Sequence, residues 1–134
     1  MHNTPDARVN SQHTKLCEML TEMCEMITDS DTEYTLIPKF AKFVMYLEHH
    51  FEYEESAMRA SNYFDVEAHT AAHAQFKVTV TKIYRNAMYN TASLKDNLPT
   101  IARALKTHIE TEEKIFSTEL LPSFYSKSTY AEFS

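Results

Sequence analysis

The chain of 134 residues contains no glycine. Glycine takes positive φ angles at no steric cost, so tight β-hairpin turns and phosphate-binding loops commonly depend on it. An all-β domain or a dinucleotide-binding α/β domain is therefore disfavoured. Helices joined by turns of Asn, Asp, Ser and Thr need no glycine, so we expect an all-α fold.

Length and charge narrow the class of protein further. The length suits one domain with a single core, which we expect to span residues 1–134. The net charge is −6 and Lys and Arg form no cluster, which argues against a nucleic-acid partner. No apolar run approaches the ~20 residues of a membrane span, and no secretory signal pattern opens the sequence. We therefore expect a cytoplasmic protein with no membrane partner.

The two cysteines agree with a reducing compartment. Cys17 and Cys24 lie seven residues apart in a helical pattern, which places their Cα atoms roughly 10 Å apart. That distance is too long for a disulfide between them. We expect both thiols to be reduced and to serve as small buried hydrophobic residues.

Apolar residues recur at helical spacing in four stretches. The predicted helices cover about residues 11–28, 35–62, 65–87 and 98–121. The N-caps expected for the last three are Thr35, Asp65 and either Asn97 or Ser93. Short connections make sequential helices antiparallel neighbours, so we predict an up-down-up-down four-helix bundle over 11–120. An irregular N-terminal arm, residues 1–10, would precede it, and a C-terminal tail, residues 121–134, would follow.

Each predicted helix carries histidine on its apolar stripe. These histidines are His13, His50, His69, His73 and His108. Carboxylates join them on two helices, where Glu54 lies four residues after His50 and Glu112 and Glu113 follow His108. Residues four apart project from one helix face, so facing helices can bring these groups together in the core.

Burying so many ionisable groups is costly unless they bind a metal. A lone histidine on an apolar face is usually a hydrogen-bonded core residue, but five with two carboxylates would leave many polar groups unsatisfied. The set exceeds one tetrahedral zinc site and suits two octahedral ions with bridging carboxylates. The stripes show no Glu-x-x-His pair, which disfavours a ferritin-like ligand set.

Four motifs in order resemble the hemerythrins, specifically the bacterial hemerythrin-like domains. The motifs are VNSQHTKL at 9–16, HHFEYEESAM at 49–58, HTAAH at 69–73 and HIETEEKIF at 108–116. The resemblance extends over all four predicted helices. It implies two non-haem iron ions bridged by an oxo or hydroxo group.

The resemblance also implies a ligand set. One iron would take His69, His73 and His108, the other would take His13 and His50, and Glu54 and Glu113 would bridge them. The second iron would keep an open position for dioxygen. The family has Asp where this chain has Glu113, whereas helical spacing from His108 alone slightly prefers Glu112. We expect His49, Glu52 and Glu55 to be solvated and not to act as ligands.

The activity implied is reversible binding of dioxygen for carriage, storage or sensing, with no catalytic residue assigned. Candidate walls of the ligand pocket are Leu20, Met23, Phe51, Leu105 and Ile109. One alternative is a di-iron oxidoreductase acting on nitric oxide or peroxide, or an iron donor for cluster repair. Another is a sensor whose contacts with a protein partner depend on dioxygen.

Overall fold

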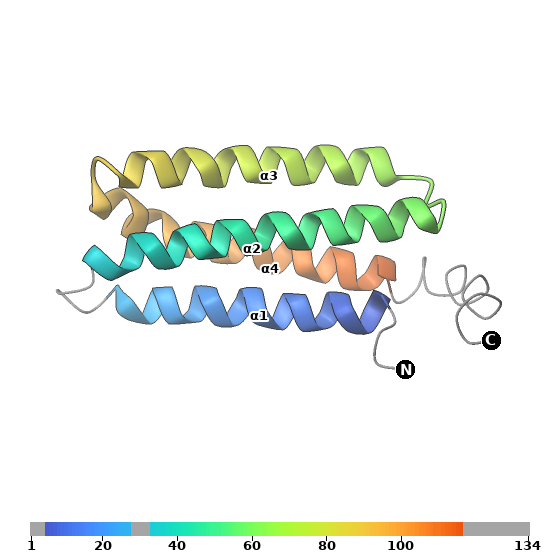
Figure 1. Ribbon diagram of the computed structural model, residues 1–134, viewed down its shortest axis with the longest axis horizontal. Coiled ribbons are helices and arrows are strands. Elements are labelled where there is room, and N and C mark those ends of the chain that lie inside the picture. Colours follow the sequence, from blue (N-terminus) through green and yellow to red (C-terminus); the bar gives the residue numbers. More distant parts are fainter. Residues whose placement is uncertain (1–4, 28–32, 117–134) are drawn as a thin grey trace.

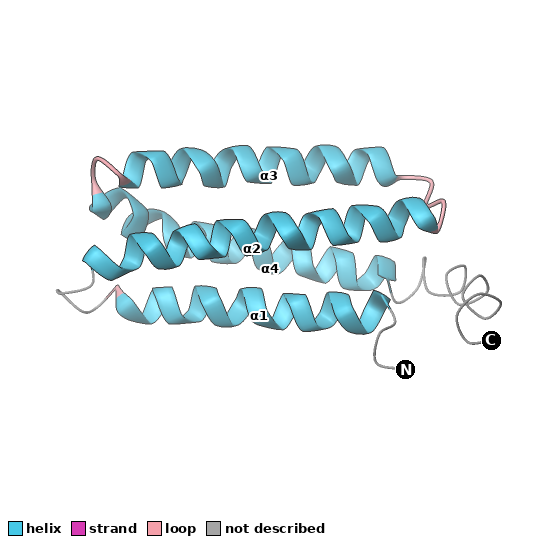
Figure 2. Ribbon diagram, in the orientation of Figure 1, coloured by secondary structure: helices cyan, strands magenta, loops and turns pink. Residues whose placement is uncertain are grey.

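The computed structural model describes residues 5–27 and 33–116, which form four α-helices (Figure 1). The helices are α1 (Pro5–Met26), α2 (Glu33–Ala60), α3 (Val66–Ala87) and α4 (Thr91–Lys114). No strand occurs among these described residues (Figure 2). The predicted all-α fold is confirmed.

The four helices form an up-down-up-down bundle, as the sequence predicts. Both α1 and α3 pack against α2 and α4. Consecutive helices run antiparallel, so α1 begins and α4 ends at the same end of the bundle (Figure 1). Every helix therefore presents one face to a shared interior, and side chains from all four can meet there.

The turn after α2 shows how a chain without glycine ends a helix. Asn62 takes a positive φ of 54°. The N–H of Tyr63 donates to the carbonyl of Met58, at 3.0 Å, and the N–H of Asn62 donates to that of Arg59, at 3.1 Å. This bonding pattern is the Schellman motif, in which asparagine can replace glycine at the left-handed position.

The first helix starts earlier than predicted. Residues 5–10 belong to α1, so the expected irregular arm is wrong for them, and residues 1–4 lie outside the described part of the chain. Burial explains the extension, because Val9 is fully buried against Ala57, Met58, Ile115 and Phe116. An apolar contact of this kind stabilises helix that propensity alone would not predict.

The expected caps are right for one helix of three. Asp65 is the N-cap residue of α3, although its side chain makes no capping hydrogen bond. Thr35 lies inside α2. The N-cap of α4 is Asn90, whose side-chain oxygen accepts from the N–H of Ala92 at 3.1 Å. This cap starts α4 earlier than the predicted start near residue 98, and Pro99 lies inside the helix. The predicted end of the fourth helix and the C-terminal tail lie outside the described residues.

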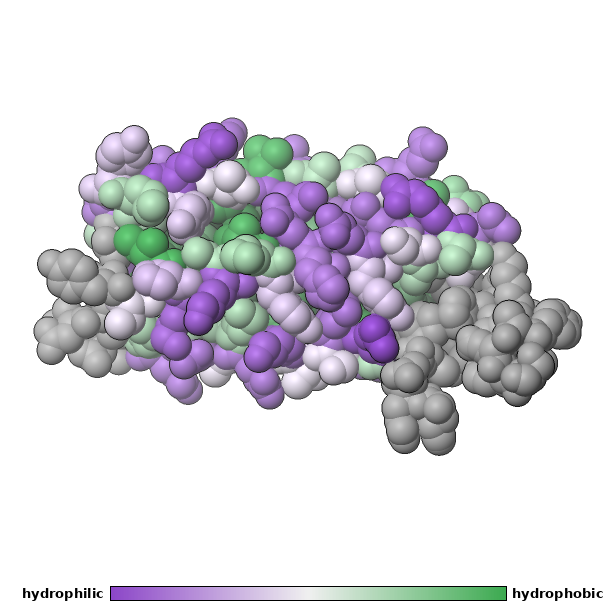
Figure 3. All heavy atoms as spheres, in the orientation of Figure 1, coloured by the Kyte–Doolittle hydropathy of each residue, from purple (hydrophilic) through white to green (hydrophobic). Residues whose placement is uncertain are grey.

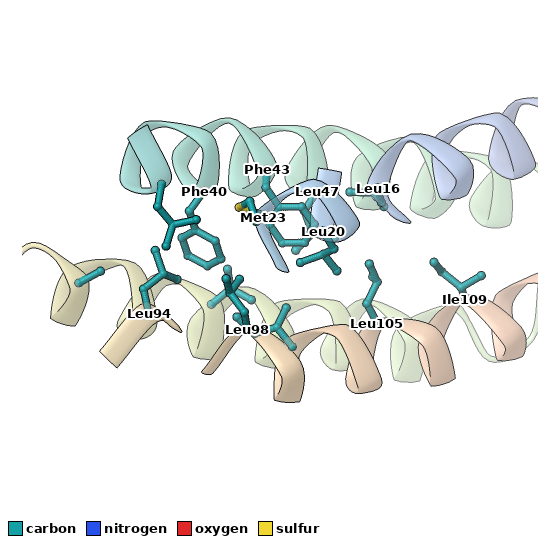
Figure 4. Packing of buried hydrophobic residues seen from close by; sticks show 14 of the residues in the cluster. Leu16, Leu20, Met23, Phe40, Phe43, Leu47, Leu94, Leu98, Leu105 and Ile109 are labelled. Carbon is teal, nitrogen blue, oxygen red and sulfur yellow. The ribbon is translucent and has the colours of Figure 1, made fainter. Parts of the chain in front are cut away.

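The interior contains two apolar clusters separated along the bundle axis. The larger one joins all four helices, and in Figure 4 the labelled side chains of α4 point toward those of α1 and α2. It includes every predicted pocket-wall residue, namely Leu20, Met23, Phe51, Leu105 and Ile109. The smaller cluster is the one around Val9 at the other end. Between the two lies a polar layer.

The face of the bundle drawn in Figure 3 is largely hydrophilic with scattered apolar patches. None of the described helices is long and apolar enough to cross a membrane. Cys17 is exposed to solvent, so the prediction that it is buried is wrong. Cys24 is partly buried against the larger cluster, closer to expectation.

Candidate metal centre

The polar layer is built by side chains that continue the apolar stripes of all four helices. In α1, His13 lies between the buried Val9 and Leu16. In α2, His50 and Glu54 take the corresponding positions. The layer therefore faces inward for the same periodic reason as the core above and below it. Its central members are His13, His50, Glu54, His73, His108 and Glu112.

Two of the helices supply a histidine and a glutamate one turn apart. The Nε2 atom of His50 lies 3.0 Å from Oε2 of Glu54. The Nε2 atom of His108 contacts Oε2 of Glu112. Since residues at i and i+4 share a helix face, each pair presents an imidazole nitrogen and a carboxylate to the same point.

Glu112 reaches histidines from every helix. Its Oε1 atom lies 3.2 Å from Nε2 of His13 and 3.5 Å from Nε2 of His50. Its Oε2 atom lies 2.6 Å from Nε2 of His73 and also contacts His108. One oxygen therefore faces the α1–α2 pair of histidines and the other faces the α3–α4 pair.

Glu54 spans the same two pairs from the opposite helix. Its Oε2 atom lies 3.1 Å from Nε2 of His13, and its Oε1 atom lies 3.4 Å from Nε2 of His73. The result is two overlapping groups that share both carboxylates. One contains His13 and His50, the other His73 and His108, and within each group the ligand atoms lie within 4.8 Å of one another.

Hydrogen bonds within the protein leave part of this donor set unsatisfied. Among the described residues, His50 Nε2, Glu54 Oε1 and His108 Nε2 are buried and have no hydrogen-bond partner. Their close approaches to neighbouring carboxylates lack hydrogen-bond geometry. Inward-facing nitrogen and oxygen atoms without partners are what a metal-binding site offers, so these residues fit bound metal ions.

The two carboxyl groups differ electrostatically. Burial raises the pKa of Glu54 well above its ordinary value, and the charges of nearby Glu112 and Glu55 add to the increase. Burial would also raise the pKa of Glu112, but interactions with the Glu54 carboxyl group and with the surrounding imidazoles lower that pKa instead. Of the two carboxyl groups, Glu54 is therefore the one whose environment favours the protonated form and Glu112 the one whose environment favours the charged form.

Burial also disfavours the charged form of His50. Desolvation lowers its pKa, and the neighbouring His13 and His108 lower it further, against an opposing contribution from Glu112. A neutral imidazole offers a lone pair to a metal ion, so this environment favours the ligating form.

The structure places five of the seven predicted ligands in the cluster. Those five are His13, His50, Glu54, His73 and His108. His69 lies in neither group; it is half-buried, and its ring lies 5.7 Å from that of Tyr63. Burial lowers the pKa of His69 as well.

The structure brings Glu112, not Glu113, between the histidines. Glu112 is fully buried, whereas the side chain of Glu113 is 47% exposed and its Oε2 atom lies 3.1 Å from Nδ1 of His13. Helix geometry is the reason, because Glu112 is one turn from His108 while a residue five positions on is rotated about 140°. The family pattern had outweighed this spacing in the prediction.

Two further contacts were missed from the sequence. Glu55 was expected to be solvated, but its Oε2 atom lies 2.8 Å from Nδ1 of His73. Gln12 is buried and its Oε1 atom lies 2.7 Å from Nδ1 of His50. In the sequence, Gln12 and Glu55 are marked only by being next to a predicted ligand. The exposed His49 is also next to one, so this position in the sequence does not identify residues that contact the site.

The sequence matches a known protein family. The family model described as "Hemerythrin HHE cation binding domain" matches residues 4–120. The chain belongs to the hemerythrin family. Comparisons with curated proteins and with solved structures gave no match. As a hemerythrin-family domain, the protein is a cation-binding four-helix bundle whose His and Glu groups could hold metal.

Proposed function

We propose that the protein binds a pair of iron ions in the polar layer and that this di-iron centre binds dioxygen reversibly. The observation that carries the proposal is the sharing of Glu54 and Glu112 by two histidine pairs. Carboxylates that face two groups of nitrogen donors suit a bridged pair of ions rather than a single one.

The proposed ligand set has six residues. His13 and His50 bind one ion, His73 and His108 bind the other, and Glu54 and Glu112 bridge. This set departs from the predicted one by leaving out His69 and by using Glu112 in place of Glu113. Each ion then takes two nitrogens and two oxygens from the protein, so an octahedral ion keeps positions for an external ligand.

The surroundings of the layer suit a small apolar ligand such as dioxygen. Phe51 is fully buried and its ring stacks on that of His73, with centroids 3.9 Å apart and an interplanar angle of 5°. Leu105 and Ile109 close the α4 side. Two ferrous ions would supply the electrons for dioxygen binding, and the apolar walls exclude the water that promotes irreversible oxidation.

The test is anaerobic loading with ferrous iron, followed by optical spectra on exposure to air and again after oxygen is removed. We expect a dioxygen-dependent absorption band that appears and disappears over repeated cycles. Iron uptake without any band, or a band that never reverses, would contradict reversible binding.

Two observations favour a second candidate, an oxidoreductase acting on nitric oxide or peroxide. With four histidines instead of five, neither ion is saturated by protein ligands. In addition, a surface groove of about 460 Å³ between α1 and α4 reaches His13 and Glu113. Substrate turnover that depends on a supplied reductant, measured on the iron-loaded protein, would favour this candidate over dioxygen carriage.

A further inference from the structure

Three of the four histidines in the polar layer make a second contact on the side away from its centre. The Nδ1 atom of His50 lies 2.7 Å from Oε1 of Gln12. The corresponding atom of His73 lies 2.8 Å from Oε2 of Glu55. For His13 the partner is Oε2 of Glu113, at 3.1 Å.

Each contact joins two neighbouring helices. Gln12 on α1 reaches His50 on α2, and Glu55 on α2 reaches His73 on α3. Glu113 on α4 reaches His13 on α1. A histidine on one helix is thus oriented by the next helix, so the ring positions depend on the packing of the whole bundle.

The chemistry of these contacts fixes which nitrogen faces inward. A carboxylate or amide oxygen only accepts hydrogen bonds, so each Nδ1 atom must carry the donated hydrogen. The Nε2 atom is then the one presented to Glu54 and Glu112. An outer acceptor of this kind sets the orientation of a metal-binding imidazole and raises its basicity.

We propose that Gln12, Glu55 and Glu113 are positioning residues that hold the Nδ1–H groups of His50, His73 and His13 outward and aim their Nε2 atoms at the metal pair. This inference rests on the proposed di-iron function. It gives Glu113 a role other than that of a bridging ligand.

The three partners are not equivalent. Glu55 is a carboxylate whose side chain is only 16% exposed, whereas Glu113 is 47% exposed and Gln12 is a neutral amide. Charge-assisted hydrogen bonds are the stronger ones, and solvent weakens them. Glu55 should therefore hold its histidine most firmly, and His73 should be the strongest nitrogen donor of the three.

The test compares Glu55→Leu, which removes the acceptor, with Glu55→Gln, which keeps an acceptor and removes the charge. Glu52→Ala on the exposed face of α2 is the matched control. The first readout is the proton NMR signal of the Nδ1–H of His73 in metal-free protein. We expect a downfield, slowly exchanging signal in the parent protein, Glu52→Ala and Glu55→Gln, and its loss to solvent exchange in Glu55→Leu.

The second readout is affinity for Co²⁺, used as a spectroscopic probe. Loss of an outer partner typically weakens metal binding 10- to 100-fold, so we expect about that loss in Glu55→Leu and partial rescue in Glu55→Gln. A protected Nδ1–H signal in Glu55→Leu, or unchanged Co²⁺ affinity in that variant, would overturn the inference. Parent protein that shows the protected signal but binds no metal would instead count against the di-iron proposal alone.

Discussion

Replacing each of the two shared glutamates, Glu54 and Glu112, by glutamine should destabilise the metal-free protein to very different extents. The lowered pKa of Glu112 favours its charged form, and each of its oxygens contacts two imidazoles. In Glu112→Gln the negative charge disappears, so the buried imidazoles around this position lose a charged partner. Removing one partner of a buried charge interaction costs about 3–5 kcal/mol, and we expect a loss of that size.

Glu54→Gln should barely change the metal-free protein. Burial raises the pKa of Glu54, which favours the neutral carboxyl group, and a neutral amide is a close substitute for that form. We expect a change of about 1 kcal/mol or less in the free energy of unfolding. Both variants should lose the stabilisation that metal confers, which is about 2.7 kcal/mol for one site at a hundredfold excess over Kd.

The assay is thermal unfolding by circular dichroism, first with chelator and then with excess ferrous iron under anaerobic conditions. At about 4 °C per kcal/mol for a chain of this size, metal-free Glu112→Gln should melt about 12–20 °C below the parent protein. Glu110→Gln, an exposed neighbour on α4, should match the parent in both states. If metal-free Glu112→Gln is as stable as the parent while Glu54→Gln is strongly destabilised, the reasoning about which group holds the proton is refuted.

Other consequences concern pH and packing. Because the folded-state pKa of Glu54 is raised, its proton contributes stability below about pH 4.5 that is lost as pH rises through the folded pKa. As the pH rises through this pKa, the melting temperature of the metal-free parent should therefore fall relative to that of Glu54→Gln. Parallel pH profiles for the two proteins would contradict this prediction. The lowered pKa of His50 acts the other way, so the stability it contributes above about pH 6.5 should be lost on acidification, and His50→Gln should reduce that acid dependence in the same melts. Phe51→Ala removes a fully buried ring stacked on His73 and should cost about 3–5 kcal/mol in chemical unfolding, whereas Phe64→Ala at a side chain 84% exposed should cost little; equal losses would contradict the assigned packing.

Much of the fold could be predicted from the sequence because helical periodicity reports directly on burial. The absence of glycine and four apolar stripes were enough for an up-down-up-down bundle. The residues at which helices start were harder to predict. Val9 extends α1 through contacts with α2 and with residues beyond α4, and such contacts leave no pattern in the local sequence. The predicted start of α4 is also too late, because the cap is Asn90 and the helix continues through Pro99.

Residues of the candidate site could be predicted where they lie on the apolar stripe of a helix. They could not be predicted where membership depends on how far a side chain extends toward a neighbouring helix. His13, His50 and His108 follow from spacing alone. His69 shares its helix with His73, one turn away, and only packing shows that the polar layer uses one of the two. The roles of Gln12 and Glu55 depend on contacts between helices, which local sequence does not encode.

Metal content per chain tests the central claim most directly. After anaerobic loading and removal of free iron, the parent protein and His69→Ala should each hold about two iron ions per chain, and Glu113→Ala, which loses only the outer partner of His13, should keep most of them. Glu112→Ala should hold fewer, because both ions lose a ligand. One ion per chain in the parent protein, or iron loss in Glu113→Ala with full retention in Glu112→Ala, would contradict a pair of ions bridged by Glu54 and Glu112.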